Sequence, residues 1–126
     1  MDNFLFSCMP RPERALYVWV PVSPDDPLET PQKRLDLLSF CVTHGVTLLY
    51  LDMYRYLGNG NGSEAKTAIM QGFIASAHAQ GIAVHALGGD TDWSDTSTHS
   101  WIATNIPGKI YDYNNASLPN QRFDGF

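Results

Sequence analysis

Three short apolar runs alternate along the chain with longer segments whose apolar residues recur at helical spacing. The runs cover residues 15–20, 47–51 and 82–87, the last interrupted only by a histidine. Each has the length of a strand, and each is apolar enough to be buried on both faces. Strands alternating with helices indicate βαβ units, and therefore a parallel sheet.

The segments between the runs carry residues that favour helix ends. Thr30 followed by Pro31 is a preferred start of a helix, and Ser63 can cap a second one. Gly45 and Gly81 stand where these helices should stop, because glycine readily adopts the positive φ found just past a helix. The sequence therefore predicts one helix between Pro31 and Gly45 and another between Ser63 and Gly81.

The last quarter of the chain predicts an interrupted helix and the start of another strand. Residues 101–103 suggest a short helix, Pro107 and Gly108 should interrupt it, and residues 109–115 can resume it. Residues 123–126, Phe-Asp-Gly-Phe, are typical of a strand that is just beginning.

Strand starts then fall near residues 15, 47, 83 and 123, which is the rhythm of βαβ units. We therefore expect an α/β fold of three βα units plus the start of a fourth parallel strand. Residues 15–126 should form this single domain, and residues 1–14, which contain two prolines and no periodicity, an irregular leader.

Polar and aromatic residues stand where the predicted strands end. Trp19 lies at the end of the first run, Asp52 follows the second, and Asp90 and Trp93 follow the third. Right-handed crossovers bring all strand exits to one edge of the sheet, so these side chains should converge on one rim. Carboxylates accept hydrogen bonds from hydroxyls, and indole rings can pack on sugars. The rim thus predicts carbohydrate binding, with His85 near enough to a strand exit to reach a substrate.

Each of these residues also has a structural interpretation. Asp90 could cap the segment that follows it, and for Asp92 capping is the favoured role. Trp19 and Trp93 could fill the mouth of the fold instead of binding a ligand. A hydrogen-bonded buried imidazole is the simpler role for His85. The functional hypothesis therefore depends on the convergence of strand exits.

Composition and charge narrow the range of partners. The chain has 126 residues, a net charge of −5 and no basic stripe, so nucleic acid is not expected. No apolar run approaches the roughly 20 residues of a membrane span, and the first residues do not make a signal peptide. His78 and His85 lack a third ligand at metal spacing, and Cys8 and Cys41 have no metal or redox spacing. We expect no metal, cofactor or membrane partner, and the cellular compartment stays open.

Two further motifs are weaker functional candidates. Gly58, Gly60 and Gly62 lie in a loop between a strand and a helix, but the loop lacks the lysine of a phosphate-binding P-loop. Its Ser63 stands where the dinucleotide fingerprint needs a third glycine. Sequons at residues 61–63 and 115–117 matter only if the chain is exported.

Six motifs together resemble the first half of a family of glycoside-hydrolase-like (β/α)8 barrels, many of them uncharacterised. They are RALYVW at 14–19, LSFCVTHG at 38–45, FIASAHAQGIAVHAL at 73–87, Gly-Asp-x-x-Trp at 89–93, Tyr-Asn at 113–114 and RFDG at 122–125. The resemblance implies a partial TIM barrel, since a full one needs roughly 250 residues. Pro107 and Gly108 depart from it by falling inside the third helix.

The resemblance also implies that the strand opening at Phe123 leads into an acidic motif, which would lie beyond Phe126. We therefore expect a truncated glycoside-hydrolase-like barrel with a carbohydrate-binding rim and no hydrolase activity by itself, and the catalytic residues stay unknown. The alternative is a non-enzymatic half-barrel that self-associates through its open sheet edges. A free-standing α/β sheet is a third outcome.

Overall fold

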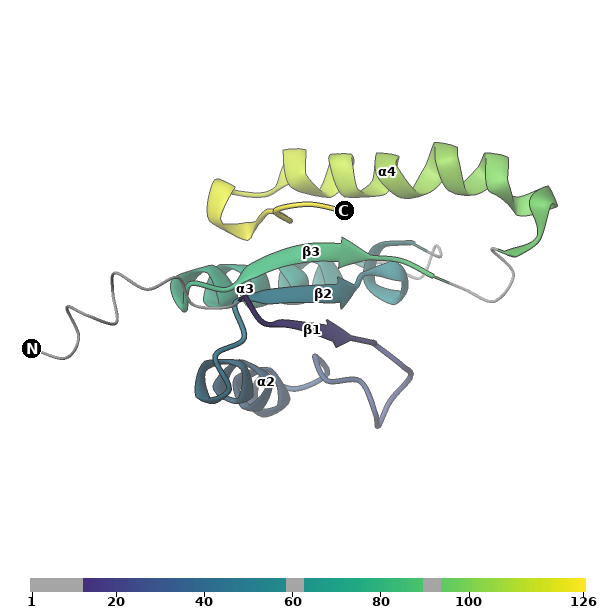
Figure 1. The fold of residues 1–126 in the computed structure, drawn as a ribbon. Coiled ribbons are helices and arrows are strands. Elements are labelled where there is room, and N and C mark those ends of the chain that lie inside the picture. Colours follow the sequence, from purple (N-terminus) through teal and green to yellow (C-terminus); the bar gives the residue numbers. More distant parts are fainter. Residues whose placement is uncertain (1–12, 59–62, 90–93) are drawn as a thin grey trace, which may run out of the picture.

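A parallel sheet of three strands, in the order β1-β2-β3, forms the centre of the fold (Figure 1). The computed structural model describes residues 13–58, 63–89 and 94–126. The strands are β1 (Ala15–Val18), β2 (Leu48–Asp52) and β3 (Ala83–Leu87). Neighbouring strands run parallel, and their register places Tyr17 opposite Tyr50 and Tyr50 opposite His85. The predicted α/β class with a parallel sheet is confirmed.

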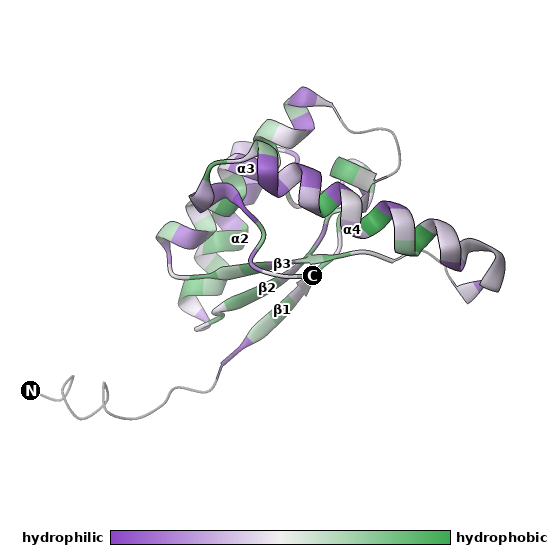
Figure 2. Ribbon diagram, turned by 90° about the horizontal axis from the view of Figure 1, so that it is seen from above, coloured by the Kyte–Doolittle hydropathy of each residue, from purple (hydrophilic) through white to green (hydrophobic). Residues whose placement is uncertain are grey.

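Three long helices lie on one side of this sheet, and the other side is left open (Figures 1 and 2). They are α2 (Pro31–Thr43), α3 (Glu64–Ala79) and α4 (His99–Ala116). A π-helical turn, η1 (Tyr54–Gly58), follows β2, and short 3₁₀ turns, η3 (Thr96–Thr98) and η4 (Pro119–Gln121), flank α4. Each strand is thus followed by a helix, as the alternating pattern predicted.

The ends of α2 and α3 form at the residues that the sequence predicts. The Thr30 hydroxyl oxygen accepts a hydrogen bond from the Lys33 backbone N–H, and the Ser63 hydroxyl oxygen accepts one from the Lys66 N–H. Gly45 and Gly81 adopt φ values of +66° and +75° just past α2 and α3. Other residues pay a steric cost at such angles, so both glycines are required by the turns they make.

The strands bury the side chains that face the helices. These side chains belong to a core shared by all three helices, and their members on the sheet are Val18, Leu49, Leu51, Val84 and Ala86. Complete burial of a leucine such as Leu49 contributes roughly 1.5–3 kcal/mol to folding. Cys41 of α2 is fully buried in the same core.

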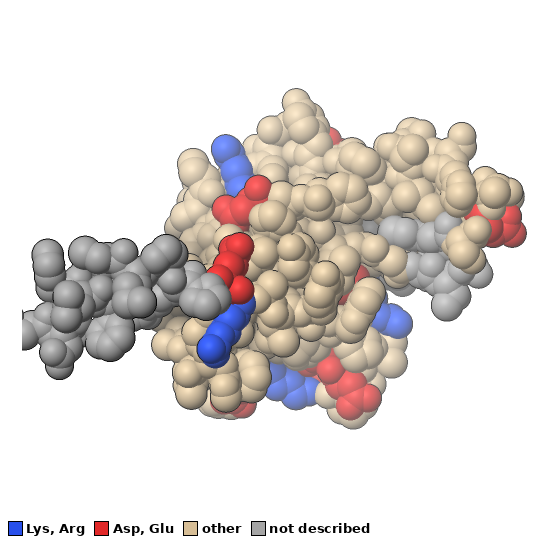
Figure 3. Space-filling model, viewed as in Figure 1, with Lys and Arg blue, Asp and Glu red and all other residues tan. Residues whose placement is uncertain are grey.

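The opposite face of the sheet carries a row of aromatic rings. Tyr17 stacks on Tyr50 with ring centroids 4.8 Å apart, and Tyr50 meets His85 edge to face at 5.7 Å. Tyr17 is 62% exposed. Figure 3 shows that the surface over the strands is largely uncharged, with acidic and basic side chains gathered around its margin.

The prediction that Pro107 and Gly108 interrupt the last helix is wrong, because α4 continues through both residues without a break. Proline inside a helix removes a hydrogen bond and costs about 3 kcal/mol. Here Pro107 is exposed, while Ile106, Ile110 and Tyr113 recur at helical spacing and are buried against the core. Burial of this stripe outweighs the local cost of the proline, and local sequence signals alone do not reveal it.

The C-terminal residues lie alongside β3, on the edge that β2 leaves free (Figure 1). The Asp124 N–H donates to the Val84 carbonyl at 2.8 Å, and the Ala86 N–H donates to the Gly125 carbonyl at 2.8 Å. These bonds form a single parallel bridge between His85 and Gly125. The expected fourth strand is therefore present as one bridge in the predicted direction.

Polar contacts of His78 hold this C-terminal segment against α3. The two ring nitrogens of His78 lie 2.7 Å from the Asn120 carbonyl oxygen and 2.7 Å from Asp124 Oδ2. The same carboxylate oxygen accepts the Val84 backbone N–H at 2.7 Å. Both ring nitrogens of His78 thus contact oxygen atoms of the C-terminal segment.

Candidate functional site

A cavity of about 330 Å³ opens at the carboxyl ends of the strands, the position at which parallel sheets bind ligands. Residues that follow β1, the end of β2 with the turn after it, and a glycine just past β3 form its walls. They are Trp19, Val20, Pro21, Asp52, Tyr54, Arg55 and Gly89. The predicted convergence of Trp19 and Asp52 is therefore seen in the structure.

Asp52 connects two walls of this cavity. One carboxylate oxygen, Oδ2, accepts the Val20 N–H at 3.3 Å, and Oδ1 accepts the Tyr54 N–H at 3.0 Å. The residue is only 8% exposed, and burial raises the pKa of its carboxyl, although the two N–H groups and nearby Arg55 oppose the rise. A carboxylate has about four acceptor positions, and these two hydrogen bonds use two of them.

Trp19 forms an exposed aromatic wall of the cavity. Its side chain is 56% exposed, and its ring packs beside Gly89. A Cβ built on Gly89 would lie 3.7 Å from Cη2 of this ring, in ordinary van der Waals contact. The indole therefore rests on the backbone that leaves β3 and keeps much of its surface open to a ligand.

His85 lies on the open sheet face, away from the lining of the cavity. Its ring meets Tyr50 edge to face, and the Gly125 backbone lies against it. The residue is half-buried. In the register Asp52 pairs with Leu87. His85 precedes Leu87 by two residues, so it lies on the same face of the sheet but further from the carboxyl end of β3. Its role as a substrate-binding residue stays a prediction.

Asp90 and Trp93, the other two predicted rim residues, lie outside the described residues, as does Asp92. The described chain reaches Gly89, which lines the cavity. Most of the glycine-rich loop, residues 59–62, also lies outside the described part. The predictions made for these positions stay predictions.

Two cavity residues, Tyr54 and Arg55, were missed by sequence reasoning. They belong to the π-helical turn η1, a rare conformation that is frequent at functional sites. Their position directly after a strand that ends in Asp52 is a signal that could have identified them. An arginine at a strand exit, next to a carboxylate, supplies the donors that a polar ligand needs.

A second cavity of about 350 Å³ adjoins the first, and Pro21 and Arg55 line both. Its other lining residues come from the loop after β1, from η1 and from α3. They are Val22, Ser23, Asp26, Glu29, Tyr56, Lys66 and Ile69. The two cavities therefore share a wall, although no sequence motif connects their residues.

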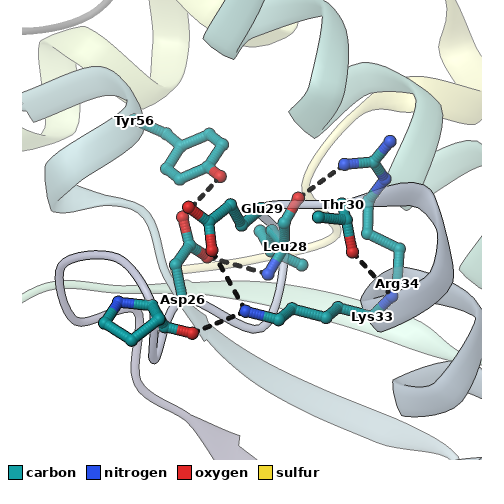
Figure 4. A network of polar contacts seen from close by, with 8 residues as sticks. Asp26, Leu28, Glu29, Thr30, Lys33, Arg34 and Tyr56 are labelled. Carbon is teal, nitrogen blue, oxygen red and sulfur yellow. Dashed lines mark hydrogen bonds and ion pairs between the residues drawn. The ribbon is translucent and has the colours of Figure 1, made fainter.

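A network of hydrogen bonds fixes the polar side of the second cavity (Figure 4). Asp26 accepts the Leu28 N–H at 2.7 Å and the Tyr56 hydroxyl at 2.8 Å. Glu29 pairs with Lys33 at 3.0 Å. Burial, and then the hydrogen bond to Asp26, raise the pKa of the Tyr56 hydroxyl well above its usual range. Tyr56 is therefore a hydrogen-bond donor held in place at neutral pH.

No known protein family, curated protein or solved structure matches this chain. The candidate site is therefore defined by its own geometry. None of the helices in the described residues is both long enough and apolar enough to cross a membrane.

Proposed function

We propose that this chain is part of a glycosidase-like (β/α)8 barrel whose rim binds carbohydrate without hydrolysing it. The observation that carries the proposal is that the Trp19 ring and the Asp52 carboxylate border one cavity at the carboxyl ends of parallel strands. Ligands of (β/α)8 barrels bind at this end of the strands.

The chemistry of the cavity suits a sugar. Trp19 offers an exposed aromatic surface for the C–H face of a pyranose, and Asp52 retains acceptor positions for hydroxyl groups. Arg55 adds hydrogen-bond donors on the same wall. An apolar platform with a few convergent polar groups, in a cavity of this size, is typical of small-molecule sites.

The arrangement of the strands supports a barrel. Spatial order follows chain order, all neighbours are parallel, and the helices cover one face only. The C-terminal segment bridges β3 on its free edge in the parallel direction, as the next barrel strand would. Tyr17, Tyr50 and His85 would then point toward the barrel interior, where side chains of alternate strands fill the centre.

Binding without hydrolysis is proposed because of the carboxylates. Asp52 is the sole carboxylate among the described residues that line the first cavity. Glycoside hydrolysis ordinarily uses a pair of carboxylates on either side of the scissile bond. The carboxylates of the second cavity, Asp26 and Glu29, already bind protein groups.

Calorimetric titration of the protein with a panel of oligosaccharides tests this function. We expect saturable binding that Trp19→Ala abolishes, because the stacking surface is lost. Trp101→Ala is the matched control, since Trp101 is 42% exposed on α4 and lines neither cavity. Absence of binding to every oligosaccharide, or binding that Trp19→Ala leaves intact, would contradict the proposal.

The open sheet face favours a second candidate function, a half-barrel that pairs with another copy of itself. This face is largely uncharged and displays the aromatic row that begins at Tyr17 (Figure 3). Within the described residues, β1 is paired along one edge only. Sedimentation equilibrium should then show a dimer that Tyr17→Lys dissociates. A folded monomer at all concentrations would exclude this function.

A further inference from the structure

The second cavity is lined by two cations, Arg55 and Lys66, of which Arg55 also lies near the Asp52 carboxylate of the first cavity. Within the described residues the ion pairs are Lys33–Glu29 and His78–Asp124, so neither Arg55 nor Lys66 belongs to one. Both line the second cavity. The Lys66 ammonium lies 5.9 Å from the centroid of the Tyr56 ring, which can hold a cation by its π face.

The carboxylates of the same cavity are already engaged. Asp26 accepts one backbone N–H and the Tyr56 hydroxyl, and Glu29 is paired with Lys33. Hydrogen bonds from Ser23 and then Lys33 lower the pKa of the Glu29 carboxyl. The lining therefore carries equal numbers of cations and carboxylates, but both carboxylates already bind protein groups, whereas Arg55 and Lys66 belong to no ion pair within the described residues.

Arg55 connects the second cavity to the proposed sugar cavity. Its side chain lines both cavities, together with Pro21. A guanidinium presents a planar array of donors that matches a carboxylate, sulfate or phosphate group, and an ammonium adds a compact second charge. An anionic group beside Arg55 would therefore lie next to a sugar that stacks on Trp19.

From this geometry we infer that the second cavity is a subsite for an acidic substituent, so that the carbohydrate bound at the rim is an anionic one. The inference rests on the proposed function and adds the class of ligand. The neutral part of the ligand packs on Trp19 and bonds Asp52, and its anionic group bonds Arg55 and Lys66. Tyr56 and Ile69 provide the apolar part of the subsite.

Calorimetric titrations with matched oligosaccharides test the inference. The pair is a uronate oligosaccharide and its carboxyl-reduced neutral counterpart, and a sulfated form of the neutral counterpart is a third probe. We expect one of the two acidic forms to bind about tenfold more tightly than the neutral form, with an advantage that falls as salt rises. Which acidic form gains the advantage identifies the anion.

Lys66→Gln is the decisive variant, because it removes a charge of the second cavity without touching the first. It should abolish most of the preference for the acidic form and leave the affinity for the neutral form unchanged. Lys109→Gln, on α4 and outside both cavities, is the matched control and should keep the preference. Circular dichroism of each variant confirms that it is folded.

The outcomes separate the inference from the function on which it rests. Equal binding of neutral and acidic forms, or a preference that survives Lys66→Gln and Arg55→Gln together, overturns the acidic subsite and leaves carbohydrate binding standing. Failure of all forms to bind overturns both. A preference that Lys66→Gln removes and Lys109→Gln retains supports both.

Discussion

The imidazole of His85 lies so close to Gly125 that no side chain fits between them. A Cβ built on Gly125 would be 2.9 Å from ring Cε1 and 3.0 Å from Nδ1. The ring is also held on its other side by Tyr50. Gly125 is therefore required by packing: its backbone approaches β3 only because it carries no side chain.

Gly125→Ala should destabilise the protein by about 1–3 kcal/mol, because the methyl group displaces His85 or detaches the C-terminal segment. Urea unfolding measures the change. Gly72→Ala is the matched control: a Cβ at this exposed position in α3 meets nothing within 4 Å, and alanine should stabilise by about 0.5–1 kcal/mol.

Adding His85→Ala to Gly125→Ala tests the cause of that loss. If the ring is the obstacle, the double variant should lose less stability than the two single variants together, which gives a coupling energy of about 1 kcal/mol. Strict additivity would show that His85 does not cause the loss.

His78→Ala should loosen the C-terminal segment. The substitution removes hydrogen bonds to Asn120 and Asp124, and we expect a loss of about 1 kcal/mol, since both partners of the ion pair are partly exposed. Hydrogen exchange should accelerate at the Asp124 and Ala86 amides, which bind the segment to β3. Unchanged exchange at both amides would show that backbone pairing alone holds the segment.

Asp52 should make stability fall as pH rises above the ordinary carboxyl range. Burial raises the pKa of Asp52 in the folded state above its ordinary value of 3.8, so between these two pKa values the native state holds more protons than the unfolded state. Stability contributed by the protonated form is complete below 3.8 and is lost as pH rises through the folded pKa. Asp52→Asn should remove this pH dependence in unfolding titrations.

The same variant should show a second, constant effect. Asparagine offers one side-chain acceptor oxygen where Asp52 uses two, so either the Val20 or the Tyr54 N–H loses its partner. This should cost about 1–3 kcal/mol at every pH. A difference between wild type and variant that rises with pH would contradict the raised pKa.

Cys41 should be inert in the native protein. It is fully buried, and burial raises the pKa of its thiol, so little of the reactive thiolate forms. In a Cys8→Ser variant, modification by a thiol reagent should proceed only through unfolding and accelerate with urea. Rapid modification without denaturant would show that α2 opens locally.

Local signals in the sequence predicted the fold well where backbone chemistry decides the outcome. Thr30 and Gly81 mark helix ends because a side-chain acceptor and a positive φ are local requirements. The continuity of α4 could not be predicted in this way, since burial of Ile106 and Ile110 against distant residues overrides Pro107.

The candidate site was likewise predicted only in part. Trp19 and Asp52 were predicted because strand exits of parallel units converge by topology. Arg55 was missed because its place depends on a π-helical turn that has no simple sequence pattern. The second cavity was missed because Ser23 and Lys66 are brought together only by the folded chain.

The carboxylate of Asp52 holds the backbone after β1 with one oxygen and the turn after β2 with the other. The spacing between these two segments is therefore set by one side chain. The second of these segments continues into η1, which supplies Arg55 and Tyr56 to the second cavity. One buried carboxylate therefore acts as a cross-brace between the loops from which both cavities are built.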